Sequence, residues 1–247
     1  MIVIHYIRTL IAGIFVLLFL SVFSLFALPI VWLIGKNDRV KREKAARAII
    51  DRALHFLCFT LGIKSKLVGK ENLPSEPCLI VGNHRSFFDV ITLFPHMHGI
   101  RIGFVGKKEF GKVFTFKLWL LYCGCFLLDR DDPRAGLRTI NDAINALSGG
   151  ANIVIYPEGT RNHNDELLPF HEGSFRIAEK SRCPIVPLVH IHTDDAFEKH
   201  FPYATPRKDL VNIIGEPIIT KELDRQGFKD ACQKCISEID RIYKENV

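Results

Sequence analysis

A long apolar run fills the first part of the chain. From Thr9 to Gly35 the sequence contains no charged residue. A helix over these 27 positions is roughly 40 Å long, more than the roughly 30 Å hydrocarbon core of a bilayer. The run is too long for the apolar part of a typical signal peptide, and no small-residue cleavage pattern precedes the basic segment after it. Residues 1–35 are therefore predicted to be a retained membrane anchor.

Two features bear on the shape and orientation of this anchor. Pro29 interrupts the run, which predicts a kink or an end of the helix and thus a bent or two-helix anchor. Residues 36–52 then carry seven basic and three acidic side chains. Basic residues beside an apolar segment stay on the cytoplasmic side and attract anionic lipid, although an ordinary solvated helix face is the alternative. We expect membrane lipids as partners, and the rest of the chain on the cytoplasmic face of the cell inner membrane.

After the anchor, the apolar positions first follow a helical period and then alternate between strand-like and helix-like runs. Residues 36–62 have apolar side chains at 46, 49, 50, 53, 54 and 57, which predicts a basic amphipathic helix that lies on the membrane or covers the core. Strands are expected at 65–69, 78–83, 102–107, 125–129, 151–159, 184–191 and 211–217. Helices are expected at 87–95, 113–124, 133–150, 173–181 and 230–246. This alternation predicts an α/β fold with a mostly parallel, helix-covered sheet over residues 63–247.

Composition adds limits to this picture. The net charge is +6, but much of it lies in residues 36–52, so no nucleic-acid partner is needed to explain it. The seven cysteines have no disulfide-like spacing and are expected to be reduced thiols. Cys232 and Cys235 resemble half a metal motif, but their segment is helical in pattern, and His190 and His192 complete no ligand set. We expect no metal and no cofactor.

The stretch "VGNHRSFFDV", residues 81–90, places His84 and Asp89 just after a buried strand. One interpretation is local, because Ser86 and Asp89 fit the S-x-x-D pattern that caps a helix. The other is chemical: His84 removes a proton from a substrate, while Asp89 holds its ring and stabilises the imidazolium. Ligands of parallel sheets bind beyond the carboxyl ends of the strands. Because Arg130 and Glu158 also follow strands, the chemical interpretation gains weight.

A second unusual stretch is "IYPEGTRN", residues 155–162. Gly159 allows a tight turn from which Thr160 and Arg161 project, and an arginine at such a turn suits a phosphate group. Glu158 would repel phosphate, so it is expected to position an arginine or the acceptor hydroxyl. A surface turn with a solvated arginine is the alternative.

Further cationic groups follow two neighbouring strands of the pattern. "GCFLLDR" ends in Arg130, and "FVGKKEF" contains Lys107 and Lys108. A solvated ion pair between Asp129 and Arg130 is the local alternative. If these cations converge at one end of the sheet near His84, they form an anionic-ligand pocket.

Four blocks resemble the glycerolipid acyltransferases, the 1-acyl-sn-glycerol-3-phosphate acyltransferase family. "NHRSFFD" matches the N-H-x4-D motif, and "GCFLLDR" resembles a second block, G-x-h-h-h-x-R with h apolar. "YPEGTRN" resembles F-P-E-G-T-R-S, and "IVPLV" resembles an apolar fourth block that contains proline. Order and spacing agree over about residues 64–217. Tyr156 in place of the usual Phe and Asn162 in place of the usual Ser are mild departures.

This resemblance implies transfer of a fatty acyl chain from acyl-CoA or acyl carrier protein to the sn-2 hydroxyl of 1-acyl-sn-glycerol-3-phosphate (lysophosphatidic acid), forming phosphatidic acid. A free alcohol needs a base to attack a thioester at neutral pH, a role that falls to His84 with Asp89. The residues expected to bind the substrate or its phosphate are Lys107, Arg130, Glu158, Gly159, Thr160 and Arg161. Two alternatives stay open: the same fold acting on another lysolipid or on glycerol-3-phosphate, and a catalytically silent lipid-binding protein.

Overall fold

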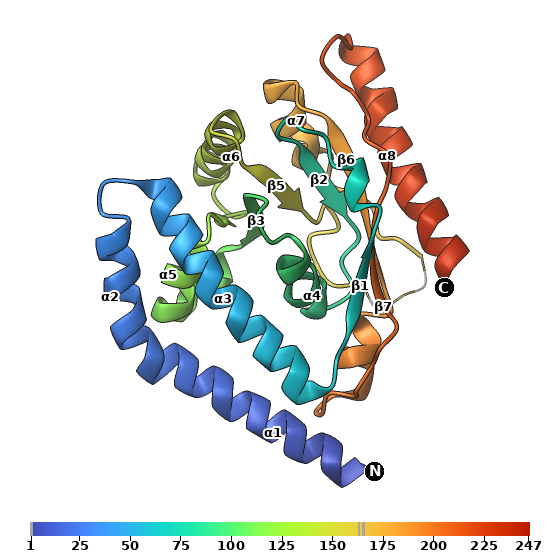
Figure 1. Cartoon of the computed structure of the whole chain (residues 1–247). Helices are drawn as coiled ribbons and strands as arrows, with labels where there is room; N and C mark the ends of the chain where they lie inside the picture. The colour runs from blue at the N-terminus through green and yellow to red at the C-terminus, as the bar shows by residue number, and fades with distance from the viewer. Residues whose placement is uncertain (1, 163, 165) are drawn as a thin grey trace.

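The computed structural model describes residues 2–162, 164 and 166–247 and contains one seven-stranded sheet. The strands lie in the order β1-β7-β6-β2-β5-β3-β4 (Figure 1). Their bounds are β1 Ser65–Val68, β2 Leu79–Gly82, β3 Ile102–Lys107, β4 Phe126–Leu128, β5 Asn152–Ile155, β6 Ile185–Ile191 and β7 Leu210–Ile214. Five of the six strand pairings are parallel and only β6–β7 is antiparallel. The mostly parallel sheet expected from the sequence is confirmed.

Helices join and cover these strands. Their bounds are α1 Ile2–Leu18, α2 Ser24–Ile34, α3 Arg39–Leu61, α4 Phe88–His96, α5 Phe114–Tyr122, α6 Pro133–Ser148, α7 Arg176–Ser181 and α8 Arg225–Asn246. Asp132 caps α6 by accepting from the N–H groups of Arg134 and Ala135, with Pro133 in the first turn. The terminal helix starts at Arg225, five residues before its expected start.

Two apolar cores lie on opposite faces of the sheet. Alternate residues of β2 divide between them: Leu79 and Val81 pack with α6, α7 and α8, whereas Ile80 packs with α3, α4 and α5. This division follows from the two-residue period of a strand. All four residues of β2 are buried. The residues that follow the carboxyl end of β2 are therefore attached to a tightly packed central strand.

The N-terminal apolar segment is helical from Ile2 to Ile34, long and apolar enough to cross a membrane. The helix does not end at Pro29, which lies inside α2, and it bends at a π-helical turn over Phe19–Phe23, before that proline (Figure 1). The Ser24 hydroxyl donates to the Phe19 carbonyl at 2.7 Å and accepts from the Trp119 indole N–H at 2.7 Å. Such π-turns are an ordinary cause of sharp bends. The length and composition of this helix are compatible with membrane anchoring.

Helix α3 covers the sheet rather than standing free. It runs between the α1–α2 pair and the rest of the molecule (Figure 1), and it contacts α1, α2, α4 and α5. Arg47 donates from its guanidinium to the carbonyls of Ile102 and Ile100, at 2.7 and 3.0 Å. Of the two placements expected for residues 36–62, covering the core is the one the structure contains.

Candidate active site

His84 lies two residues beyond β2, and Asp89 lies in the first turn of α4. The two side chains meet at 2.7 Å, between Nδ1 of the imidazole and Oδ2 of the carboxylate. Asp89 is fully buried, whereas the His84 side chain is 20% exposed. With Nδ1 donating to Asp89, the lone pair of the neutral ring is on Nε2, which hydrogen-bonds to no group in the described part of the chain. This is the tautomer that a general base at Nε2 requires.

The same carboxylate oxygen also caps α4. Asp89 Oδ2 accepts from the backbone N–H groups of Arg85 and Ser86, at 2.7 and 3.0 Å. In return, the Ser86 hydroxyl accepts from the N–H of Phe88 at 2.9 Å. The capping and chemical interpretations are therefore compatible, because the atom that caps the helix is the atom that holds His84.

The environment of Asp89 favours its charged form. Burial by itself raises the pKa of this carboxyl, but the neighbouring His190 and His84 and the hydrogen bonds it accepts more than offset that effect. The pKa of Asp89 therefore lies below its ordinary value of 3.8. A carboxylate that stays ionised can stabilise an imidazolium on His84.

A buried aromatic residue backs the His84 ring. Tyr156 stacks on it with ring centroids 4.6 Å apart and planes 15° apart. The Tyr156 hydroxyl lies 3.2 Å from Nε2 of His190, whose Nδ1 lies 2.7 Å from Oδ1 of Asn212. Burial lowers the pKa of His190, and its Nδ1 donates to the amide oxygen of Asn212. The hydroxyl that distinguishes Tyr156 from the usual phenylalanine thus has a partner inside the core.

Both carboxylate oxygens of Glu158 bind backbone N–H groups. Its Oε1 accepts from the backbone N–H of His84 at 2.8 Å, and its Oε2 accepts from the N–H of Leu168 at 3.0 Å. The carboxylate thus ties the loop after β5 to the backbone of His84, and the expected role of Glu158 in positioning an arginine or the acceptor hydroxyl stays a prediction. Burial raises the pKa of Glu158, and these two hydrogen bonds only partly oppose that rise.

Arg130, which follows the edge strand β4, contacts the loop after β5. Its Nη1 donates to the Gly159 carbonyl at 3.0 Å. Gly159 has φ = 69°, a backbone conformation that favours glycine, and a Cβ built there would displace the Arg130 guanidinium. The structure brings Arg130 and the turn together, as predicted.

Arg161 is held by protein groups near the start of α4. Its Nη1 lies 3.0 Å from Oε1 of Glu198, and its guanidinium stacks on Phe87 at 3.9 Å from the ring centroid. Glu198 also accepts from the Ser86 hydroxyl at 2.6 Å and from the Phe87 N–H at 3.0 Å. Sequence reasoning missed Glu198, because it lies 114 positions after His84 in a segment without a recognisable motif. Thr160, beside Arg161, is exposed.

The lysines after β3 do not complete a pocket at His84. Lys107 is exposed at the end of β3, two strands away from β2 in the sheet. Lys108 is bound to two carboxylates, with its Nζ 2.8 Å from Asp129 and 2.7 Å from Asp131. Of the cations expected to meet near His84, Arg130 contacts the 159–161 turn. Lys108 instead belongs to a separate cluster with Asp129 and Asp131.

The cysteines do not supply a nucleophile to this site. All seven are free thiols, and five are buried. Burial raises the pKa of Cys58, Cys125 and Cys232 to about 11. A thiol with so high a pKa forms almost no thiolate at neutral pH. Within the described residues, no cluster of three or more His, Cys, Asp or Glu side chains could hold a metal ion.

Treatment with iodoacetamide at pH 7 is therefore expected to leave the transfer rate within about twofold, because alkylation needs a thiolate. The measurement is initial rate against incubation time, with mass spectrometry of the labelled protein. Stoichiometric inactivation that an acyl donor prevents would instead point to a cysteine that carries the acyl group.

With this geometry in place, comparison with known proteins is informative. A family model described as Acyltransferase matches residues 64–191, which include His84, Asp89 and the whole 155–162 turn. The chain belongs to the acyltransferase family. The family assignment made from the four sequence blocks is thus confirmed.

Individual acyltransferases agree with this assignment. The chain is 30% identical to the 1-acyl-sn-glycerol-3-phosphate acyltransferase alpha of Bos taurus, over 84% of this chain and 69% of the relative. It is 28% identical to the 1-acyl-sn-glycerol-3-phosphate acyltransferase of Saccharomyces cerevisiae, over 77% of this chain and 63% of that relative. It is 31% identical to a chloroplastic 1-acyl-sn-glycerol-3-phosphate acyltransferase of Brassica napus, but spans only 47% of it.

The fold has a counterpart among solved acyltransferase structures. The 1-acyl-sn-glycerophosphate acyltransferase of Thermotoga maritima superposes with a TM-score of 0.76, covering 98% of this chain and 97% of that one. Sequence identity between the two is 22%. The match spans almost the whole of both chains, so the shared fold extends over the N-terminal helical segment of this one.

Proposed function

We propose that this protein transfers a fatty acyl chain from a thioester donor to the sn-2 hydroxyl of 1-acyl-sn-glycerol-3-phosphate, forming phosphatidic acid. The observation that carries the proposal is the contact of 2.7 Å between His84 and Asp89 at the end of β2. The relatives from Bos taurus and Saccharomyces cerevisiae are named for this activity. A binding protein needs a pocket for its lipid, but it has no use for a base held in one tautomer.

In this mechanism the acceptor hydroxyl approaches Nε2 of His84. As the oxygen attacks the thioester carbon, Nε2 takes the hydroxyl proton, and Asp89 stabilises the imidazolium that forms. The tetrahedral intermediate then collapses with loss of the thiolate, which takes up the proton and leaves as the thiol. Tyr156 limits the rotation of the His84 ring, and Glu158 fixes the backbone on which the ring is carried.

The acceptor phosphate is assigned to the cationic side chains at the neighbouring turn. Arg130 and Arg161 both border this turn, and Thr160 is exposed on it. The apolar helix from Ile2 to Ile34, long enough to cross a membrane, supports a position of this site beside the membrane in which a lysolipid acceptor lies. We infer that the catalytic part faces the cytoplasm, because the basic segment after the helix favours that side.

The decisive experiment supplies purified protein in detergent with radiolabelled acyl donor and a panel of acceptors. Lysophosphatidic acid is expected to be the preferred acceptor, over glycerol-3-phosphate and over lysolipids with larger head groups. Preference for one of the other acceptors would assign the same chemistry to a different lipid. Binding of lysolipid with no transfer to any acceptor would identify a silent lipid-binding protein.

Replacing Arg161 by alanine is expected to raise the KM for lysophosphatidic acid about tenfold or more, with little change in kcat. A charge-assisted hydrogen bond to phosphate contributes about 1.5–3 kcal/mol, and it is made in the ground state as well as the transition state. Arg161→Lys should recover only part of the affinity, because lysine lacks the planar fork of arginine. Steady-state kinetics on acceptors with and without phosphate measure the effect.

The matched control is Glu198→Gln, which weakens the ion pair but keeps Arg161. If Arg161 binds phosphate, this variant leaves the KM unchanged or lowers it. If Arg161 only supports the start of α4 through Glu198, both variants raise the KM alike and affect acceptors without phosphate to the same extent. That second pattern would remove Arg161 from the binding site.

A further inference from the structure

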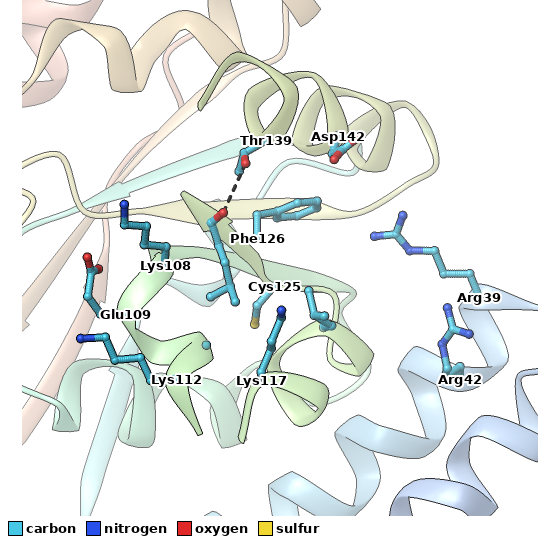
Figure 2. A pocket seen from close by; sticks show the side chains of 13 residues that line it. Arg39, Arg42, Lys108, Glu109, Lys112, Lys117, Cys125, Phe126, Thr139 and Asp142 are labelled. Atoms are coloured by element: carbon cyan, nitrogen blue, oxygen red, sulfur yellow. Dashed lines mark hydrogen bonds between the residues drawn. The ribbon is translucent and has the colours of Figure 1, made fainter. Parts of the chain in front are cut away.

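A basic hollow lies beside β4, at the edge of the sheet farthest from β1, and we call it the edge groove. Its volume is about 830 Å³, and it is bounded by α3, the segment Lys108–Lys112, α5, β4 and α6. Five cationic side chains line it, namely Arg39, Arg42, Lys108, Lys112 and Lys117. Figure 2 shows Arg39 and Arg42 on one side of the groove, Lys108 and Lys112 on the other, and Lys117 between them. Only two lining residues, Glu109 and Asp142, are acidic.

Two of these cations are already neutralised by the protein. Lys108 contacts Asp129 and Asp131, and Arg39 contacts Glu43 at 2.8 Å. Lys112 and Lys117, by contrast, are exposed and form no ion pair with any residue that the structure describes. The groove therefore has positive charge that is left over for a ligand.

Arg42 adds a second and independent sign of a ligand site. Its guanidinium lies 5.2 Å from the centre of the Tyr122 ring, on the side of α3 that faces the groove. Its Nε is buried, yet it has no hydrogen-bond partner among the described residues. Buried donors in folded proteins nearly always have a partner. An anion in the groove would supply one.

Strand β4 connects this groove to the site at His84. Phe126 and Leu127 line the groove, and Arg130, two residues beyond the strand, reaches the carbonyl of Gly159. A second hollow of about 350 Å³ continues from Thr139, which borders both cavities, to Arg130. The sheet order separates β4 from β2 by three steps, or roughly 14 Å at the usual spacing of strands.

We propose that the edge groove binds the phosphate-bearing nucleotide end of a coenzyme A thioester. Coenzyme A carries a pyrophosphate and a 3′-phosphate, which match a concave site with several uncompensated cations. Its extended pantetheine arm is long enough to cross from β4 to β2, past Arg130, and to present the thioester at His84. The inference rests on the proposed acyl transfer and specifies its donor as acyl-CoA.

The test measures binding of free coenzyme A to the full-length protein in detergent, by isothermal titration calorimetry. Lys112→Glu combined with Lys117→Glu is expected to raise the Kd about a hundredfold, since each lost charge-assisted contact costs about tenfold. The matched control, Lys229→Glu with Lys234→Glu, makes the same change in charge on exposed positions of α8 and should bind as wild type. Wild-type protein should also bind dephospho-coenzyme A more weakly than coenzyme A.

Steady-state KM values then separate the groove assignment from the proposed acyl transfer. The groove variant should raise the KM for acyl-CoA and leave the KM for lysophosphatidic acid unchanged. If the wild type transfers acyl groups while the groove variant keeps its affinity for coenzyme A, the groove assignment is overturned and the proposed function stands. If the wild type binds coenzyme A through the groove but transfers to no acceptor, the groove assignment is supported and the proposed function falls.

Binding of the same variants to anionic lipid vesicles and to acyl carrier protein tests two other possible occupants of the groove. If the groove variant loses binding only to vesicles that contain phosphatidylglycerol, the groove is a contact for anionic lipid and the proposal is wrong. If it loses binding only to acyl carrier protein, the groove receives an acidic protein and the proposal is again wrong. Lys112→Ala with Lys117→Ala provides a milder variant, whose melting temperature should equal that of the wild type.

Discussion

His84→Ala is expected to lower kcat by about 10²–10⁴-fold, the contribution of a well-placed general base. The reason is geometric: Nε2 is the only free nitrogen of a ring whose other nitrogen is bound to Asp89. Single-turnover rates with lysophosphatidic acid and acyl-CoA measure the chemical step apart from product release. The affinity for coenzyme A should stay unchanged, since the edge groove does not include His84.

The control for this variant is the stability of the fold. His84 is partly exposed and its ring is not part of either large core, so the melting temperature of His84→Ala should fall by only a few degrees. Activity within about tenfold of wild type, at the same stability, would contradict the role of a base. Asp89 would then be left as the cap of α4 alone.

Deleting residues 1–35 is expected to abolish association with vesicles and also to destabilise the remaining chain. The first effect follows from the loss of the one helix, among the described residues, that is both long and apolar enough to cross a membrane. The second follows from packing: Ala27, Leu28 and Val31 of α2 are buried in the core that contains Trp119. Each buried aliphatic side chain of this size contributes about 1.5–3 kcal/mol, against a total stability of about 5–15 kcal/mol for a typical domain.

Flotation with liposomes and thermal melting in detergent measure the two effects separately. Ser24→Ala is the matched variant, because it removes only the hydroxyl that accepts from the Trp119 N–H. It should float with liposomes as the wild type does and lower the stability by about 1–3 kcal/mol, because the buried N–H of Trp119 loses its partner. If the truncated chain melted at the same temperature as the wild type, residues 1–35 would form an independent anchor. That result would agree with the domain boundary after residue 35 that the sequence predicts.

Hydrophobic periodicity predicted most of the fold because the sheet is nearly all parallel and buried. Each strand from β2 to β6 coincides with a short apolar run, and the helices between them have clear start and stop residues such as Asp132 and Pro133. The position of the bend in the anchor was not predictable in this way. It depends on Ser24 and Trp119, which are far apart in the sequence and meet only in the folded chain.

The candidate site was likewise predictable only in part from the sequence. Motif spacing found His84, Asp89 and Gly159, whose roles are set by neighbours within a few residues or by the end of a strand. It did not reveal the partners of the Glu158 carboxylate, because the two N–H groups that bind it belong to the backbone, which every residue has. Charge counting likewise grouped Lys108 with the phosphate site, although Asp129 and Asp131 hold it elsewhere.

The bond between Ser24 and Trp119 has a consequence for how the protein meets its acceptor. Because α2 is packed into the core and not tethered by a flexible linker, the height of His84 relative to the apolar helices is fixed. Under the proposed function, the protein is then expected to meet lysolipids by lateral diffusion at one depth, and not by swinging out to collect them from solution. The rate on vesicles should therefore follow the mole fraction of lysolipid in the surface, and diluting it with inert phospholipid should slow turnover even at constant bulk concentration.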